Sequence, residues 1–219
     1  MPPPTRLYLI RHGQSDGNAS GRFGGHGPTP LSALGREQAE KTARVLAKEG
    51  VQTIYSSDLL RALQTAEPLA ASLNLPINKS EAFRERHVGV LEGLTFDESK
   101  ARYPSDYYAL INRSIHHVIT DGESYRQLLS RITAELRKIL LNHQSQRIAI
   151  FSHTGAICYT ILHLLGAIHR GTRFTPWIVT SNCGINRFEF RSPQNVRVLA
   201  LNDTRHLIQA TGNDSFAAR

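Results

Sequence analysis

Apolar residues recur along the chain in two spacings. Short aliphatic or β-branched runs, such as Leu7–Ile10, Thr53–Tyr55 and Arg147–Phe151, are typical of buried strands. Longer stretches repeat their apolar residues every three or four positions, as amphipathic helices do. Because the two patterns alternate, we expect an α/β fold, a three-layer α/β/α sandwich around a mostly parallel central sheet.

Three segments carry the helical pattern. One apolar stripe covers residues 59–73, and a second covers residues 128–140 and begins near Ser124. Ser32 has a side chain suited to a helix N-cap, which predicts a helix from there to about Lys48. These helices would cover the sheet with their apolar faces.

The last third of the chain shows a different pattern. Apolar runs over Ile185–Phe190 and Val196–Leu201 flank the segment Ser192-Pro193-Gln194-Asn195, which predicts two strands joined by a turn. Residues from about 210 to 219 form a tail for which we expect little order.

The length of 219 residues and 40% hydrophobic content suit one domain over residues 1–219. Cys158 and Cys183 fall in apolar surroundings and are interpreted as reduced core residues. The sequence shows no signal peptide and no apolar stretch of membrane-spanning length, so we expect a cytoplasmic protein without a membrane partner. A homodimer is left open.

The formal net charge of +8 and a pI near 9.9 suit an anionic substrate. Nucleic-acid binding is the alternative from another functional class. The basic residues are scattered over the predicted helices without a clustered stretch or interleaved aromatic residues, which argues against it as the primary role.

Two predicted strands each deliver a histidine at their carboxyl end. Arg11-His12-Gly13 follows the first strand, and Ser152-His153-Thr154-Gly155 follows the strand over Arg147–Phe151. Catalytic groups gather at the carboxyl ends of parallel strands, so both imidazoles should lie at one edge of the sheet. A neutral imidazole can attack phosphorus, and a guanidinium can hold phosphoryl oxygens.

Two further blocks complete the pattern. Ser56-Ser57-Asp58-Leu59-Leu60-Arg61 puts an arginine in the first turn of a helix, and Glu85-Arg86-His87 supplies a carboxyl group. The chain lacks zinc-ligand pairs, a run of aspartates suited to magnesium, a P-loop and a dinucleotide fingerprint. We therefore expect neither a metal nor a cofactor.

These four blocks, in this order over roughly residues 6–207, resemble the histidine phosphatase superfamily, in its phosphoglycerate mutase branch. The resemblance is strongest to the broad-specificity phosphatase subgroup. It implies a phosphohistidine intermediate, with His12 as nucleophile and Glu85 as the acid that protonates the leaving group. The remaining site residues that it implies, for catalysis or substrate binding, are Arg11, Arg61, His153, Asn18, Gly24, Gly25 and Thr154.

The resemblance also implies that residues of about 86–123 form a cap over the phosphate pocket. Mutases of the family have a longer insertion there with paired arginines, and a tyrosine where this chain has Val88. We therefore favour a metal-independent phosphomonoesterase acting on a small anionic phosphate ester. The alternative is a cofactor-dependent phosphoglycerate mutase, which Glu85-Arg86-His87 itself resembles more; a non-catalytic phospho-ligand-binding protein is a remote third.

Overall fold

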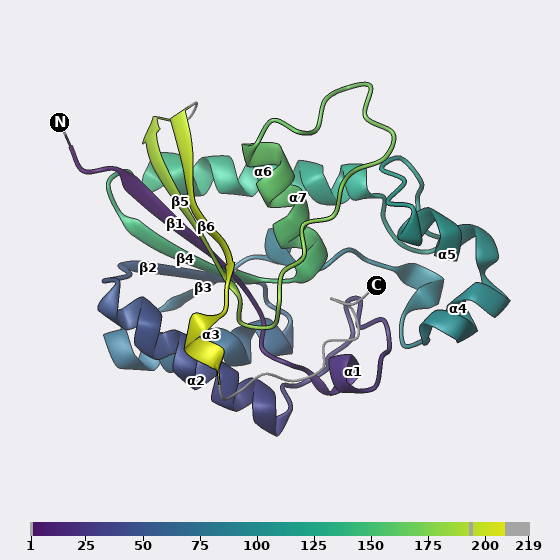
Figure 1. Cartoon of the computed structure of the whole chain (residues 1–219), viewed down its shortest axis with the longest axis horizontal. Helices are drawn as coiled ribbons and strands as arrows, with labels where there is room; N and C mark the ends of the chain where they lie inside the picture. The colour runs from purple at the N-terminus through teal and green to yellow at the C-terminus, as the bar shows by residue number, and fades with distance from the viewer. Residues whose placement is uncertain (1, 193–194, 209–219) are drawn as a thin grey trace.

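The computed structural model describes residues 2–192 and 195–208, whose central feature is one six-stranded sheet with the order β3-β2-β4-β1-β5-β6 (Figure 1). Strands β1 to β4 pair in parallel, β5 runs antiparallel to β1, and β6 antiparallel to β5. The strands are β1 (Thr5–Arg11), β2 (Thr53–Ser56), β3 (Ile77–Lys79), β4 (Arg147–Ser152), β5 (Ile185–Ser192) and β6 (Asn195–Asp203). The predicted mostly parallel α/β sheet is confirmed.

Helices cover both faces of this sheet. The α-helices are α1 (Asp16–Ala19), α2 (Ala33–Lys48), α3 (Leu60–Leu73), α4 (Phe96–Arg102), α5 (Pro104–Ile111), α6 (Tyr125–Asn142) and α7 (Thr154–Leu164). In β1, Leu7 and Leu9 pack with α6 and α7, while Tyr8 and Ile10 pack with α2 and α3. Because alternate residues of a strand face opposite sides, a continuous apolar run is what a doubly covered strand requires. The three-layer prediction is confirmed.

The predicted helix starts have a local cause. The Ser32 hydroxyl accepts a hydrogen bond from the amide of Gly35 at the start of α2. Ser124 and Gln127 form a reciprocal capping box at the start of α6. Each cap satisfies amide groups that the first helical turn leaves without partners, and this fixes where the helix begins.

Segment 86–123 contains two short helices, α4 and α5, that the apolar pattern did not predict. They lie beside the sandwich rather than on either sheet face (Figure 1). Their surroundings form a separate small core of Phe23, Val88, Leu91, Phe96 and Ile119. A helix packed on so small a core needs few apolar positions, so it shows no long stripe.

Pro193 and Gln194, where the turn between β5 and β6 is predicted, and the predicted tail lie outside the described residues. Cys158 and Cys183 are buried free thiols, and burial raises the pKa of each to about 12. No helix in the described ranges is long and apolar enough to cross a membrane. Within those same ranges, no group of three or more His, Cys, Asp or Glu residues is placed to hold a metal ion.

Candidate active site

The register of β1 and β4 brings the two histidines together. Arg11 pairs with Ser152 at the carboxyl ends of these neighbouring parallel strands. The next residue of each strand is a histidine, and the ring centroids of His12 and His153 lie 5.1 Å apart. The expected juxtaposition of the two imidazoles is therefore found.

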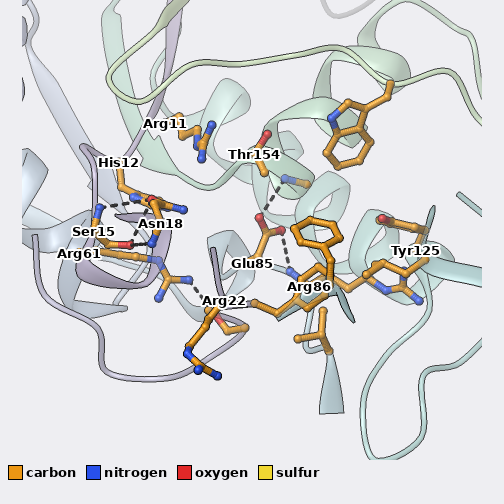
Figure 2. Close-up of a pocket in the computed structure, with 18 of the residues that line it drawn as sticks. Arg11, His12, Ser15, Asn18, Arg22, Arg61, Glu85, Arg86, Tyr125 and Thr154 are labelled. Carbon is orange, nitrogen blue, oxygen red and sulfur yellow. Dashed lines mark hydrogen bonds between the residues drawn. The ribbon is translucent and has the colours of Figure 1, made fainter. Parts of the chain in front are cut away.

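A cavity opens at this edge of the sheet, and most of the predicted site residues line it. The predicted residues in its wall are Arg11, His12, Asn18, Gly24, Gly25, Arg61, Glu85 and Thr154. His153 is not part of the wall; it is fully buried against His12. In Figure 2, His12, Asn18 and Arg61 lie on one side, Arg86 and Tyr125 on the other, and Glu85 between them in this view.

His12 is held as a neutral imidazole with one bare nitrogen. Its Nδ1 lies 2.7 Å from the carbonyl oxygen of Gly13. A carbonyl can only accept, so Nδ1 carries the proton and Nε2 of the neutral ring keeps its lone pair. Burial, followed by the charges of Arg61 and Arg11, lowers the pKa of His12 well below its usual value. The geometry therefore provides a nitrogen nucleophile over a wide pH range.

Two buried guanidinium groups flank this imidazole. Arg11 donates to the carbonyl of Thr180 at 2.6 Å, and Arg61 donates to the carbonyls of Gly25 at 2.7 Å and Gly27 at 3.1 Å. Burial lowers the pKa of Arg61 to about 10, opposed in part by Glu85. Positive charge removed from water is stabilised by an anion, so these arginines suit a phosphoryl group.

Ser57 has a role that the sequence did not reveal. Its Oγ accepts from the amide of Leu59 at 3.3 Å and lies 2.9 Å from Nε2 of His153. This contact joins the end of β2 to the ring of His153 and orients that ring. Nδ1 of His153 has no hydrogen-bond partner among the described residues. Ser57 lies at the end of β2, beside β4, and that position was the one signal available in the sequence.

Asn18 is fixed by α1 and its surroundings. Its side-chain oxygen accepts from the amide of Ser15 and from Nδ2 of Asn182, each at 3.3 Å. With the oxygen turned to these donors, the predicted donor role toward a phosphoryl group falls to the amide nitrogen of Asn18.

Glu85 is positioned by the first turn of α7. Its carboxylate accepts from the amide of Gly155 at 2.9 Å and from the amide of Arg86 at 2.8 Å. A Cβ atom on residue 155 would lie 2.4 Å from Oε1 of Glu85, so any other residue there would displace the Glu85 carboxylate from this position. No role was predicted for Gly155.

Glu92, the other carboxylate near this block, is placed differently. It does not line the cavity. Its Oε1 is buried without a hydrogen-bond partner in the described part of the chain, and Oε2 lies 3.9 Å from Nε2 of His87. Of the two carboxylates, Glu85 is the one that faces a ligand in the cavity.

Beyond the side chains that are predicted to bind phosphate, the cavity has a mainly apolar wall. We term this part the leaving-group chamber, and it consists of Phe23, Val88, Phe96, Leu110, Ile111 and Trp177 together with Arg86, Arg113 and Tyr125. Its residues come from the loop after α1, from segment 86–123, from the start of α6 and from the loop after α7. Several of them lie in the segment that was predicted to act as a cap.

Comparisons with known proteins agree with this geometry. The model of the histidine phosphatase superfamily (branch 1) matches residues 7–204. A probable phosphoglycerate mutase GpmB from Citrobacter koseri is 32% identical over 189 residues, which are 85% of each chain.

Solved structures of two phosphatases have the same fold. A mycobacterial glucosyl-3-phosphoglycerate phosphatase complexed with VO3 superposes with a TM-score of 0.78 at 26% identity, covering 91% of this chain and 99% of that one. A putative alpha-ribazole-5'-P phosphatase from Escherichia coli gives a TM-score of 0.79 at 26% identity, covering 91% and 96%. The strand-end histidines and the buried arginines agree with these matches, and we conclude that the chain belongs to the histidine phosphatase superfamily.

Proposed function

We propose that the protein is a metal-independent phosphomonoesterase that works through a phosphohistidine. The observation that carries this proposal is the neutral Nε2 of His12, bare and flanked by two buried guanidinium groups. This is the arrangement required for in-line attack on a phosphoryl group whose charge is neutralised by its surroundings.

The reaction has two steps. In the first, Nε2 of His12 bonds to phosphorus, the bond from phosphorus to the ester oxygen breaks, and Glu85 gives its proton to that oxygen. In the second, water attacks the phosphohistidine, Glu85 takes a proton from the water, and inorganic phosphate leaves with His12 neutral again. Arg11 and Arg61, which line the cavity, hold the phosphoryl oxygens in both steps, and His153 packs against the ring of His12.

The leaving-group chamber favours hydrolysis over mutase chemistry. A mutase must hold a small glycerate so firmly that phosphate returns to it before water attacks. A glycerate has no apolar surface to place against Phe23, Phe96, Leu110 and Trp177, which make up much of the chamber wall. The two phosphatases of similar fold support the same choice, whereas the name of the Citrobacter koseri relative supports the alternative.

A direct competition assay tests the proposal. The protein is supplied with 3-phosphoglycerate and catalytic 2,3-bisphosphoglycerate in EDTA, and phosphate release is compared with formation of 2-phosphoglycerate. We expect phosphate release to be faster, and we expect a generic aryl phosphate to be hydrolysed in EDTA as well. If 2-phosphoglycerate forms faster than phosphate is released, the assignment as a phosphatase is wrong and the protein is a mutase. Loss of all activity on chelation would contradict the metal-free mechanism.

A further inference from the structure

The leaving-group chamber contains two arginines, Arg86 and Arg113, that form no ion pair with a carboxylate among the described residues. Arg86 is only 2% exposed, and its side chain donates to two main-chain carbonyls, of Glu123 at 2.9 Å and of His117 at 3.1 Å. Its Nη1 has no hydrogen-bond partner in the described part of the chain. A buried guanidinium in this state is costly unless an anion or another acceptor reaches it.

Arg86 is held in place by aromatic stacking. Its guanidinium lies 3.9 Å from the centroid of the Tyr125 ring, and Tyr125 stacks on Tyr159 at 4.4 Å. The Tyr159 hydroxyl is in turn hydrogen-bonded to Thr175 at 2.7 Å. This stack positions the charge before any ligand arrives, so binding would lose little conformational freedom.

A second arginine lies on the same chamber. The guanidinium of Arg113 is 5.1 Å from the centroid of the Trp177 ring, and its hydrogen bond goes to the main-chain carbonyl of Ile111. Neither Arg86 nor Arg113 forms an ion pair with a carboxylate within residues 2–192 and 195–208. By contrast, Arg22 in the same wall is paired with Glu98 at 3.1 Å.

We propose that the alcohol portion of the substrate combines an apolar or aromatic body with a carboxylate, which Arg86 and Arg113 bind while the chamber's apolar side chains cover the body. This inference rests on the proposed function, because it names the substrate class of the same site. It explains why two unpaired arginines stand among apolar and aromatic walls rather than among polar ones. A glycerate has the carboxylate but lacks the body, so it would leave the apolar wall exposed to water.

The test uses arylphosphonates, which bind without being hydrolysed. Affinities of 3- and 4-carboxyphenylphosphonate are compared by calorimetry with those of the matching carbamoyl compounds, which keep the shape but lack the charge. We expect the wild-type protein to prefer the better carboxylate isomer by about tenfold or more, since hydrogen bonds to charged groups exceed neutral ones by this order. Equal affinity for carboxylate and carboxamide in both isomers would overturn the proposal without any variant being made.

Variants assign the preference to residues. Arg113→Gln and Arg86→Gln should each reduce the carboxylate-to-carboxamide ratio at least threefold, an order set by the loss of one charged hydrogen bond. Arg102→Gln removes the same charge from an exposed position of α4 and should leave the ratio unchanged. A ratio that both chamber variants leave intact would overturn the assignment. Because binding is measured, a protein that hydrolyses no ester but keeps the ratio contradicts only the proposed function.

Discussion

The two ends of the cavity are built in different ways. At the phosphate end, the side chains follow strands of the sheet or start helices that pack on it, and main-chain carbonyls such as those of Gly13 and Thr180 fix their orientation. At the leaving-group end, the side chains come from loops and short helices with a small core of their own. The comparison shows that the sheet and its covering helices position one end of the cavity, whereas the segments around the sheet edge shape the other end.

The largest effect should come from the phosphate end. His12→Ala removes the proposed nucleophile, and we expect turnover to fall by about four orders of magnitude or more, as when other catalytic nucleophiles are removed. Brief incubation of the wild-type protein with labelled substrate should give an acid-labile, base-stable phosphoenzyme that the variant lacks. His116→Ala, at an exposed histidine of the cap segment, serves as the control and should keep both signals. Label retained by His12→Ala would show that another group is the nucleophile.

The next largest effect separates the two carboxylates near the chamber. Glu85→Gln removes the proton donor, and turnover of alkyl phosphates should fall by about 100- to 10,000-fold, the usual contribution of general acid catalysis. Nitrophenyl phosphate needs little protonation and should lose much less. Glu92→Gln should affect the two substrates alike, because Glu92 does not line the cavity. Equal losses for both substrates in Glu85→Gln would assign the acid to another residue.

A smaller effect should follow from Ser57→Ala, because the hydroxyl acts through His153 rather than on the substrate. Without it, the ring of His153 loses the hydrogen bond that orients it, and kcat should fall by about tenfold, in line with the loss of one hydrogen bond. Ser57→Thr keeps the hydroxyl and should recover most of that rate. Ser57→Ala with unchanged kcat, or no recovery in Ser57→Thr, would argue that Ser57 only supports packing.

The smallest effect concerns stability against acid. Burial lowers the pKa of both His12 and His153 well below the usual value, so below about pH 6.5 the unfolded chain binds protons that the folded one does not. The free energy of unfolding therefore has its full value, as far as these two histidines are concerned, above about pH 6.5. It decreases as the pH falls from there toward the lowered pKa values of the folded protein. Each histidine contributes a slope of at most about 1.4 kcal/mol per pH unit to the free energy of unfolding.

Denaturant unfolding between pH 7 and pH 5, in buffer without phosphate, measures this slope. His12→Ala should reduce it, whereas the exposed His116→Ala should not. An unchanged slope in His12→Ala would show that His12 does not titrate differently in the folded and unfolded chains.

The phosphate end could be predicted from the sequence because its signals are local. A buried strand that ends in histidine, and a serine that caps a helix, each carry their meaning within a few residues. The short helices α4 and α5 were not predicted, because neither has a long apolar stripe. The sequence nevertheless contains local signals for their starts: a capping box of Thr95 with Glu98 for α4, and Pro104 in the first turn of α5.

The rest of the site depends on neighbours that sequence does not place. Gly155 matters because Glu85, seventy positions earlier, comes to its amide. Arg86 matters because Tyr125 and Tyr159 stack beneath it. The pattern of residues along the chain does not predict such long-range contacts, which form only when loops and helices pack around the edge of the sheet.

The contact between Glu85 and the start of α7 has an evolutionary consequence. Every amino acid other than glycine brings a Cβ into the space that Oε1 of Glu85 occupies. Any coding change at position 155 therefore reaches the acid directly, although residue 155 supplies no reactive group of its own. We therefore expect selection to retain glycine at this codon for as long as Glu85 serves as the acid.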